Sequence, residues 1–289
     1  MAAFAGVASS LGLAACATAP VGPAVTTSLP VEPVPAVASV SGETVPPAYQ
    51  YLYGSGEAAA LQLSAFHALI VYVTDKAAHR PANSVVLAAD SSLTNARFVP
   101  CGTKPFAVVF DVDETVLLNL GFEARGAGGV PYTASDWAAW EAGGGAAVAA
   151  TPGAAHALTD LRKLGVTPVF LTNRRNAAAT AATLKAMGLG DAGEGLVVQT
   201  DTGGKDARRQ AVAARYCVLA MAGDQLGDFS DGFNAAMPVP ARRQLAIQSA
   251  VAGLWGKGWF VLPNPVYGTA LKGGPDEVFP VDKRWSSPK

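Results

Sequence analysis

The sequence has little charge, few cysteines and no excess of charge of either sign. Charged residues make up 15% of the 289 residues, and 21 Lys and Arg against 22 Asp and Glu give a net charge of −1. This balance excludes an acidic disordered protein and a basic nucleic-acid-binding protein. Three cysteines are too few for a small domain held together by disulfides. The 31 glycines and 20 prolines are too few for a fibrous chain.

The abundant residues are apolar, at 50% of the chain. A chain of this length buries a substantial core in one large or two modest domains. Residues 57–79 carry apolar side chains at helical spacing, and polar residues interrupt the run before it is long enough to span a bilayer. We therefore expect a packed helix at this position, in a globular enzyme of the α/β type.

The N-terminal 47 residues are predicted to lie outside the folded domain. Residues 1–16 are small and apolar and end in Leu-Ala-Ala-Cys, which resembles a bacterial lipoprotein signal peptide with a lipidated Cys16. No Lys or Arg precedes the apolar run, and the alternative is an Ala-rich N-terminus with a chance cysteine. Residues 17–47 contain seven prolines and almost no charge, which predicts a disordered, extended tether. The folded domain then covers residues 48–289.

Short apolar runs and helical segments alternate along the folded domain. Such alternation predicts a Rossmann-like, doubly wound parallel sheet with helices on both faces. A long insert at about 120–150 follows the first strand, and together with the N-terminal helix it predicts a small, mainly helical cap over the carboxyl end of the sheet. The expected strands are residues 105–110, 166–171, 195–199 and 217–222, and the expected helices are residues 153–163, 176–187 and 205–215.

Polar side chains follow the predicted strands, at the edge where an open parallel sheet binds its ligands. Residues two apart at a strand end project to the same side, so Asp111 and Asp113 can face one chemical group. A single pair of this kind is weak evidence, but several polar groups at successive strand ends together indicate a catalytic site. The further candidates are Thr172, Asn173 and Arg174 after the second strand, Lys205 at the start of a basic helix, and Asp224 and Asp228 after the fourth strand.

These motifs resemble the haloacid dehalogenase (HAD) superfamily, and within it the class C acid phosphatases, which are bacterial lipoproteins with four aspartates. The resemblance spans about residues 48–272. It implies a HAD-like fold and hydrolysis of phosphate monoesters. The segments that carry it are DVDETVL at 111–117, PGA at 152–154, LTNR at 171–174, GDQLGDF at 223–229 and LPNPVYG at 262–268.

The resemblance implies a role for each acidic residue at the first and fourth strands. Asp111 would be the nucleophile that forms an aspartyl-phosphate, and Asp113 would donate a proton to the leaving alcohol. Because a carboxylate and a phosphate repel each other, a hard divalent cation such as Mg²⁺ suits this reaction. Its protein ligands would be the Asp111 side chain, the Asp113 carbonyl and the Asp224 side chain.

The other polar residues are expected around the phosphoryl group. Asp228 would either ligate the metal directly or orient one of its waters. Thr172 and the Asn173 amide would hold a non-bridging oxygen, and Lys205 would neutralise charge during transfer. Arg174 would either contact phosphate or cap the edge of the sheet.

Aromatic residues predict the substrate. Phosphatases of this class clamp a nucleobase between two aromatic rings, and Trp137 and Tyr267 match those positions by local sequence. Stacking of this kind tolerates any base and implies a 5′-nucleotidase of broad specificity. The alternative is that Trp140 and one of the other two rings pack the cap onto the sheet.

We therefore predict a Mg²⁺-dependent acid phosphatase that hydrolyses nucleoside 5′-monophosphates. The enzyme would be lipid-anchored through Cys16 in the bacterial cell envelope, on the outer membrane, and would face the periplasm or the exterior. A dehalogenase would need neither Asp113 nor Asp224. The rival from another class is a non-catalytic surface lipoprotein that binds or stores a ligand on the same fold. Cys101 and Cys217 would form either a disulfide or two buried thiols, and a homodimer is compatible with the sequence.

Overall fold

The computed structural model describes residues 1, 44–200, 203–233 and 235–287. The segment from Glu43 to Lys289 forms one compact unit, and all that follows concerns this unit. The predicted signal peptide and nearly all of the predicted tether fall within residues 2–43, which lie outside the described residues.

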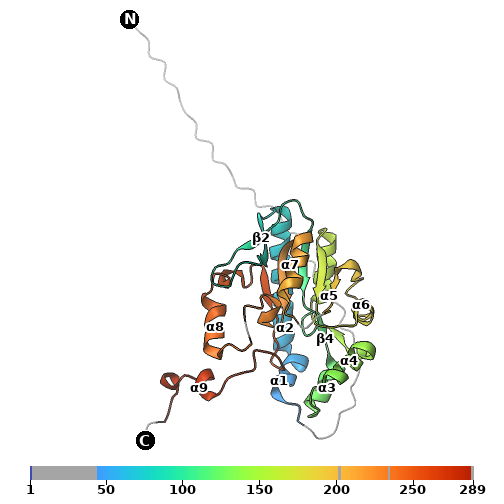
Figure 1. Cartoon of the computed structure of the whole chain (residues 1–289), viewed down its shortest axis with the longest axis vertical. Coiled ribbons are helices and arrows are strands. Elements are labelled where there is room, and N and C mark those ends of the chain that lie inside the picture. The colour runs from blue at the N-terminus through green and yellow to red at the C-terminus, as the bar shows by residue number, and fades with distance from the viewer. Residues whose placement is uncertain (2–43, 201–202, 234, 288–289) are drawn as a thin grey trace. The chain divides into compact units, whose positions relative to one another are not determined.

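A parallel sheet of five strands forms the centre of the unit (Figure 1). Its order is β7-β6-β3-β8-β9, and each neighbouring pair runs parallel. The order matches the predicted doubly wound fold, because β3, the first of these five strands in the chain, lies between strands that follow later. The bounds of the strands are Phe106–Phe110 for β3, Thr167–Leu171 for β6, Leu196–Val197 for β7, Cys217–Gly223 for β8 and Trp259–Val261 for β9.

The side chains of β3 alternate between two hydrophobic clusters, one on each face of the sheet. Val108 and Phe110 belong to the first cluster, and Ala107 and Val109 to the second. This alternation follows from the twofold period of a strand, and apolar residues at every position explain why both faces are buried. The sheet is therefore covered by helices or hairpins on both sides.

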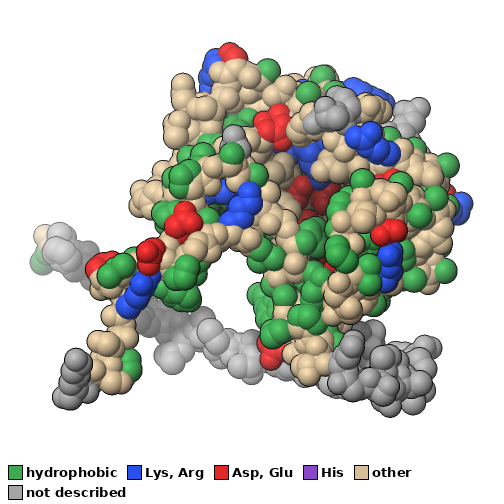
Figure 2. All heavy atoms as spheres, turned by 60° about the horizontal axis from the view of Figure 1, so that its bottom comes forward, with side chains coloured by type: hydrophobic (Ala, Val, Ile, Leu, Met, Phe, Trp, Pro, Cys, Tyr) green, Lys and Arg blue, Asp and Glu red, His purple; other side chains and the backbone are tan. Residues whose placement is uncertain are grey.

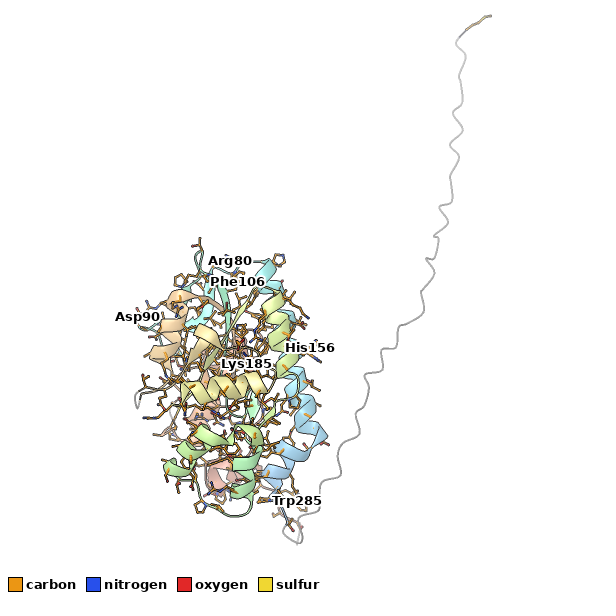
Figure 3. All side chains as sticks on the ribbon, turned by 90° about the vertical axis from the view of Figure 1, so that its right-hand side faces the viewer. Arg80, Asp90, Phe106, His156, Lys185 and Trp285 are labelled. Atoms are coloured by element: carbon orange, nitrogen blue, oxygen red, sulfur yellow. A yellow bond between two sulfur atoms is a disulfide. The ribbon has the colours of Figure 1, made fainter. Side chains whose placement is uncertain are left out.

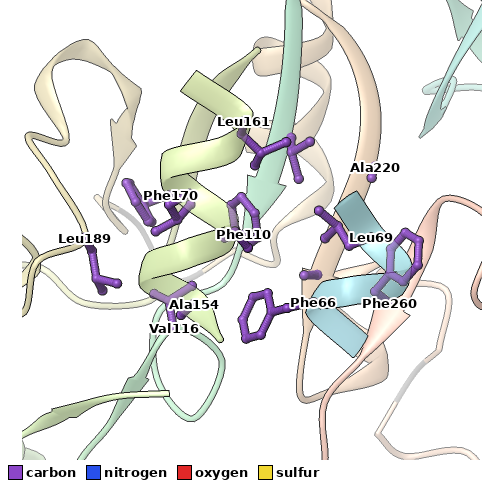
Figure 4. Packing of buried hydrophobic residues seen from close by; sticks show 14 of the residues in the cluster. Phe66, Leu69, Phe110, Val116, Ala154, Leu161, Phe170, Leu189, Ala220 and Phe260 are labelled. Carbon is purple, nitrogen blue, oxygen red and sulfur yellow. The ribbon is translucent and has the colours of Figure 1, made fainter. Parts of the chain in front are cut away.

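Three helices cover the first face of the sheet. The first cluster contains Phe66 and Leu69 of α2 and Leu161 of α5, packed with Phe110 (Figure 4). Leu184 of α6 belongs to the same cluster. The second face is covered by α7, through Val212 and Ala213, and by the hairpin β1–β2. The bounds are Gly56–Ala78 for α2, Ala154–Lys163 for α5, Ala177–Ala186 for α6, Asp206–Arg215 for α7, Asn83–Leu87 for β1 and Phe98–Pro100 for β2.

Helix α2 is the packed helix that the sequence predicted. Ser55 caps it by accepting the Ala58 N–H at 3.1 Å, and Phe66, Leu69 and Val73 are at most 1% exposed. In the part of the chain that the structure describes, α2 is also the one helix whose length and composition would allow it to cross a membrane. Its buried face explains this apolar composition without a membrane, so it is only a weak indication of an anchor.

The insert after β3 folds into short elements beside the carboxyl end of the sheet. The antiparallel strands β4 and β5 join its two ends, and α3 and α4 lie between them. Trp140 holds these parts together, because its Nε1 donates to Asn119 Oδ1 at 3.0 Å and its ring lies 5.9 Å from the Phe122 ring. A Cβ atom at Gly144 would lie only 2.1 Å from the Trp140 ring, so only glycine fits there. The bounds are Leu117–Leu118 for β4, Leu120–Ala127 for α3, Ala134–Gly143 for α4, Gly144–Ala147 for η2 and Ala149–Ala150 for β5.

Segments at both ends of the unit complete it. The α1–η1 segment precedes α2, and the chain after β9 returns along the carboxyl end of the sheet. Their bounds and those of the remaining elements are Pro47–Tyr49 for α1, Gln50–Gly54 for η1, Gly193–Gly195 for η3, Leu226–Asp228 for η4, Val239–Gln248 for α8, Ala252–Leu254 for η5, Pro275–Val278 for α9 and Val281–Lys283 for η6.

The predicted elements occur in the predicted order, with boundaries that shift by at most two residues. The largest shift is in β7, which stops at Val197 although the sequence predicted a strand to 199. After Val197 the chain leaves the sheet, and the Gln199 N–H donates to the Arg174 carbonyl at 2.9 Å. His156 was predicted on the surface, and it is exposed on the outer side of α5 (Figure 3).

The amino end of the sheet is fixed by a disulfide and a cation. Cys101 and Cys217 are bonded, with Cα atoms 4.5 Å apart across a sequence separation of 116. This bond joins the residue after β2 to the first residue of β8. Nearby, the Arg80 guanidinium lies 4.0 Å from the centre of the Phe106 ring (Figure 3) and donates to the carbonyls of Gly102 and Lys104.

Replacing both cysteines (Cys101→Ala with Cys217→Ala) is expected to lower the free energy of unfolding by about 4 to 5 kcal/mol, because a cross-link over so long a loop restricts the unfolded chain. Urea unfolding followed by circular dichroism measures this change. The unaltered protein in a reductant serves as the control, and it is expected to unfold at the same urea concentration as the double variant. A loss of less than about 1 kcal/mol would show that the bond does not constrain the unfolded chain.

Candidate active site

The register of the sheet brings the predicted polar residues to one edge. Phe110, the last residue of β3, is paired with Phe170 on one side and Ala222 on the other, and the Asp111 N–H then donates to the Ala222 carbonyl at 2.9 Å. Beyond this edge lies a cavity of about 1060 Å³. Figure 2 shows acidic and basic side chains at the base of a hollow on this face. The predicted site residues that line the cavity are Asp111, Asp113, Trp137, Asn173, Lys205, Asp224, Asp228 and Tyr267.

Three carboxylates gather in this cavity. One oxygen from each of Asp111, Asp224 and Asp228 lies within 4.8 Å of the others, and no one of these residues is more than 9% exposed. Burial raises the pKa of Asp111 well above its usual range, although Lys205 opposes this, and burial with the Asp228 carboxylate raises the pKa of Asp224 to about 7. The protein alone thus leaves negative charge here without full compensation. Oxygen donors at this spacing fit a hard divalent cation.

Lys205 is a cation that the protein itself supplies to this cluster. Its Nζ donates to Asp111 and, at 2.7 Å, to Asp228. Burial lowers the pKa of an amine, but these two carboxylates raise the pKa of Lys205 above its usual value. Its backbone is also fixed, because the Lys205 N–H donates to Asp231 Oδ1 at 2.9 Å at the start of α7. Lys205 is therefore held protonated between the two aspartates.

The loop after β8 orients the other two carboxylates. Gln225 Nε2 and Asn264 Nδ2 donate to Asp224 Oδ2 at 3.0 and 2.8 Å, and Thr115 Oγ1 donates to Asp224 Oδ1 at 3.2 Å. The Gln225 N–H donates to Asp228 Oδ2 at 2.8 Å. Asp228 thus stands in the same cluster as Asp111 and Asp224, which sequence spacing alone did not determine.

Arg174 takes a different place from the one expected of a phosphate-binding residue. Its side chain is 2% exposed and does not line the cavity. Instead, its Nε and NH2 lie 2.9 and 2.8 Å from Asp113 Oδ1, and NH2 donates to Asn119 Oδ1 at 2.8 Å. Asn119 Nδ2 also donates to Asp113 Oδ1, at 2.9 Å. The sequence left open whether Arg174 contacts phosphate or caps the edge of the sheet, and in this structure its guanidinium holds Asp113.

Thr172 and Asn173 follow β6 as predicted. Thr172 is fully buried, and its Oγ1 accepts the Arg174 N–H at 3.1 Å, so it does not line the cavity. Asn173 does line it, and its Oδ1 accepts from Arg208 NH2 at 2.7 Å. The structure thus fixes this turn through side-chain bonds to its own backbone and to α7.

Glu114 is a buried acid that the sequence reasoning missed. It adopts φ +50°, which is uncommon for a residue other than glycine, and its side chain is inaccessible. The Tyr267 hydroxyl donates to its Oε2, while the Tyr53 hydroxyl and the Asn119 N–H donate to its Oε1 at 3.2 and 2.8 Å. These bonds tie three distant segments together and hold the Tyr267 side chain at the cavity. Its position directly after Asp113 was the one available signal.

The aromatic residues of the insert divide into two roles. Trp137 lines the cavity, with its ring 5.0 Å from the Phe122 ring in an edge-to-face contact and 5.7 Å from the Arg174 guanidinium. Trp140 does not line it and packs the insert, which agrees with the sequence alternative for this ring alone, because the alternative also assigned packing to one of the other two rings. Trp137 and Tyr267 are therefore the two predicted clamp rings that reach the cavity, and no sequence signal identified Tyr49, which lines it as well.

Comparison with known proteins identifies relatives of this chain. Residues 59–270 match the model of the HAD superfamily, subfamily IIIB (acid phosphatase). Two structures of the class C acid phosphatase from Bacillus anthracis, one of them with tungstate bound, are similar to this structure with a TM-score of 0.64. They are 23% and 22% identical to it over 84% of this chain and 96% of theirs, which confirms the fold. A comparison with curated protein sequences gives no match.

The family match covers the sheet, the insert and every candidate residue at the cavity. It confirms the resemblance drawn from the motifs, and it favours an enzyme over a non-catalytic lipoprotein. The chain thus belongs to the HAD superfamily, subfamily IIIB, and is an acid phosphatase, a hydrolase of phosphate monoesters.

Proposed function

We propose that this acid phosphatase is Mg²⁺-dependent, acts through an aspartyl-phosphate and prefers nucleoside 5′-monophosphates. The observation that carries the proposal is the cluster of Asp111, Asp224 and Asp228 around Lys205, with Asp113 beside it in the same cavity. A site that only binds phosphate needs cations, whereas this one concentrates buried carboxylates. Carboxylates at this position are useful as a nucleophile, a proton donor and ligands of a metal.

The reaction divides between Asp111 and Asp113. An Asp111 carboxylate oxygen attacks phosphorus, and the bond to the ester oxygen breaks while Asp113 gives that oxygen a proton. Water then attacks phosphorus, Asp113 takes a proton from the water, and Asp111 is released together with inorganic phosphate. Arg174 and Asn119 support the second role, because they hold Asp113 Oδ1 and leave its other oxygen for the leaving group.

Charge at the phosphoryl group is managed by Lys205 and by the metal. When bound by Asp111, the Asp113 carbonyl, Asp224 and Asp228, Mg²⁺ would offset the repulsion between carboxylate and phosphate. Lys205 offsets part of the charge of Asp111 and Asp228 in the free protein and would stabilise the charge of the phosphoryl group during transfer.

The Asp111→Asn variant is expected to lose at least about 1,000-fold in kcat, because an amide cannot form the aspartyl-phosphate. Phosphate release from several monoesters by a fragment that starts near residue 48, with Mg²⁺ and with a chelator, measures this loss and the need for metal. Asp90→Asn, at an aspartate whose side chain is 70% exposed, serves as the matched control. Undiminished activity of Asp111→Asn would exclude the nucleophile, and undiminished activity in the chelator would exclude the metal.

The nucleotide preference rests on Trp137 and Tyr267, which both line the cavity. A base stacked between the rings gains about 1 to 3 kcal/mol per stacking contact. We therefore expect a nucleoside 5′-monophosphate to be cleaved about tenfold more efficiently than 4-nitrophenyl phosphate, and Tyr267→Ala to abolish most of that difference. The ratio of the two kcat/KM values measures it.

Two controls separate stacking from packing. Tyr267→Phe keeps the ring and is expected to keep the preference, and Tyr51→Ala removes a ring that does not line the cavity. Equal efficiency of the unaltered enzyme toward both substrates would end the clamp proposal.

The lipid anchor at Cys16 is a separate proposal, supported by the Leu-Ala-Ala-Cys sequence at 13–16. It would tether the enzyme to the bacterial envelope. There, removal of the phosphate would convert a charged nucleotide into a neutral nucleoside that can be taken up. Expression of the full chain in a bacterium fed a labelled fatty acid is expected to label the protein, and Cys16→Ala is expected to remain unlabelled and leave the membrane fraction. Label on the Cys16→Ala variant would contradict the proposal.

A further inference from the structure

Glu123 is a buried carboxylate that neither the fold nor the proposed reaction uses. It lies in the first turn of α3, is 8% exposed and lines the cavity. Across the described ranges 44–200, 203–233 and 235–287, no side chain or backbone group forms a hydrogen bond or an ion pair with its carboxyl group; its backbone N–H donates to the Asn119 carbonyl at 2.9 Å. Burial of a carboxyl group without a hydrogen-bond partner costs free energy of folding. Its position at the cavity wall therefore points to a ligand that supplies the missing hydrogen bond.

The groups around Glu123 leave it free for a substrate. The cation nearest in sequence, Arg125, pairs with Asp136 at 3.2 Å instead. Burial together with the Asp113 charge raises the pKa of Glu123 to about 7, and the Glu123 charge in turn raises the pKa of Tyr49. Since a carboxyl group accepts a hydrogen bond whether or not it is ionised, a neutral hydroxyl suits this position at any pH near neutrality.

Glu123 lies on the side of the cavity where the leaving group of a substrate would bind. Asp113 protonates the leaving oxygen, so the carbon atoms attached to that oxygen must lie beside Asp113, whose charge reaches Glu123. Glu123 also directly follows Phe122, whose ring contacts Trp137. Glu123 thus lies on the α3 wall of the cavity that Asp113 and Trp137 also line, and a nucleotide with its phosphate at Asp111 and its base at Trp137 places its sugar in this same cavity.

We propose that Glu123 determines specificity by accepting hydrogen bonds from hydroxyl groups of the leaving alcohol, which in a nucleotide are the 2′ and 3′ hydroxyls of ribose. The inference rests on the proposed nucleotide phosphatase function and deepens it. It assigns the sugar to the α3 wall of the cavity, apart from the residues that act on phosphorus.

Paired substrates test this inference. Adenosine 5′-monophosphate and its 2′,3′-dideoxy analogue have the same base and phosphate, and they differ only in the two hydroxyls. The unaltered enzyme is expected to prefer the ribonucleotide about tenfold in kcat/KM, as one or two hydrogen bonds to a carboxyl group would give. Glu123→Ala is expected to remove this preference by raising KM for the ribonucleotide, whereas Glu123→Gln, which keeps an acceptor, is expected to retain most of it.

Glu57→Ala is the matched control, because Glu57 also lies in the first turn of a helix but is exposed. Thermal unfolding of each variant checks that the fold is intact. An unaltered enzyme that cleaves both nucleotides equally would overturn the inference while leaving the proposed function in place. An equal loss on both substrates in Glu123→Ala would show a structural role only, and failure to cleave either nucleotide would overturn both proposals.

Discussion

The site depends on the pairing of buried carboxylates with the few cations that can reach them. Lys205 lies between Asp111 and Asp228, and Arg174 holds Asp113. A buried carboxylate without such a partner would take up a proton, and a protonated aspartate is neither a nucleophile nor a ligand of a metal. The two cations therefore favour the ionised forms of the aspartates that they contact, against the burial that raises the pKa of Asp111, and the negative charge that they do not offset fits a divalent cation.

The sheet makes this concentration of charge sustainable. β3 is buried between β6 and β8, so Asp111 follows a strand that cannot move without breaking two ladders. At the opposite end, the disulfide between Cys101 and Cys217 joins the start of β8 to the residue after β2. The sheet and the disulfide thus support the site from below, and the hydrogen bonds of the loop after β8 orient Asp224 and Asp228 on this support.

Segments far apart in the chain form the substrate-facing walls. Glu114 joins the α1–η1 segment, the turn after β3 and the C-terminal loop through Tyr53 and Tyr267. The insert contributes Trp137 and Glu123 to another wall. These walls come from outside the sheet, apart from the strand ends that carry Asp111 and Asp224.

The sequence by itself determined the order of strands and helices along the chain and the residues at the strand ends. Strand periodicity can be seen in a short stretch of sequence, and ligands of an open parallel sheet bind at the carboxyl ends of its strands. It also placed Asp111, Asp113, Asp224 and Lys205 at one edge. Only the tertiary structure decided that Arg174 holds Asp113, that Asp228 joins the cluster, and that Cys101 is bonded to Cys217. These depend on which side chains meet after distant segments pack, and no local pattern of residues carries that information.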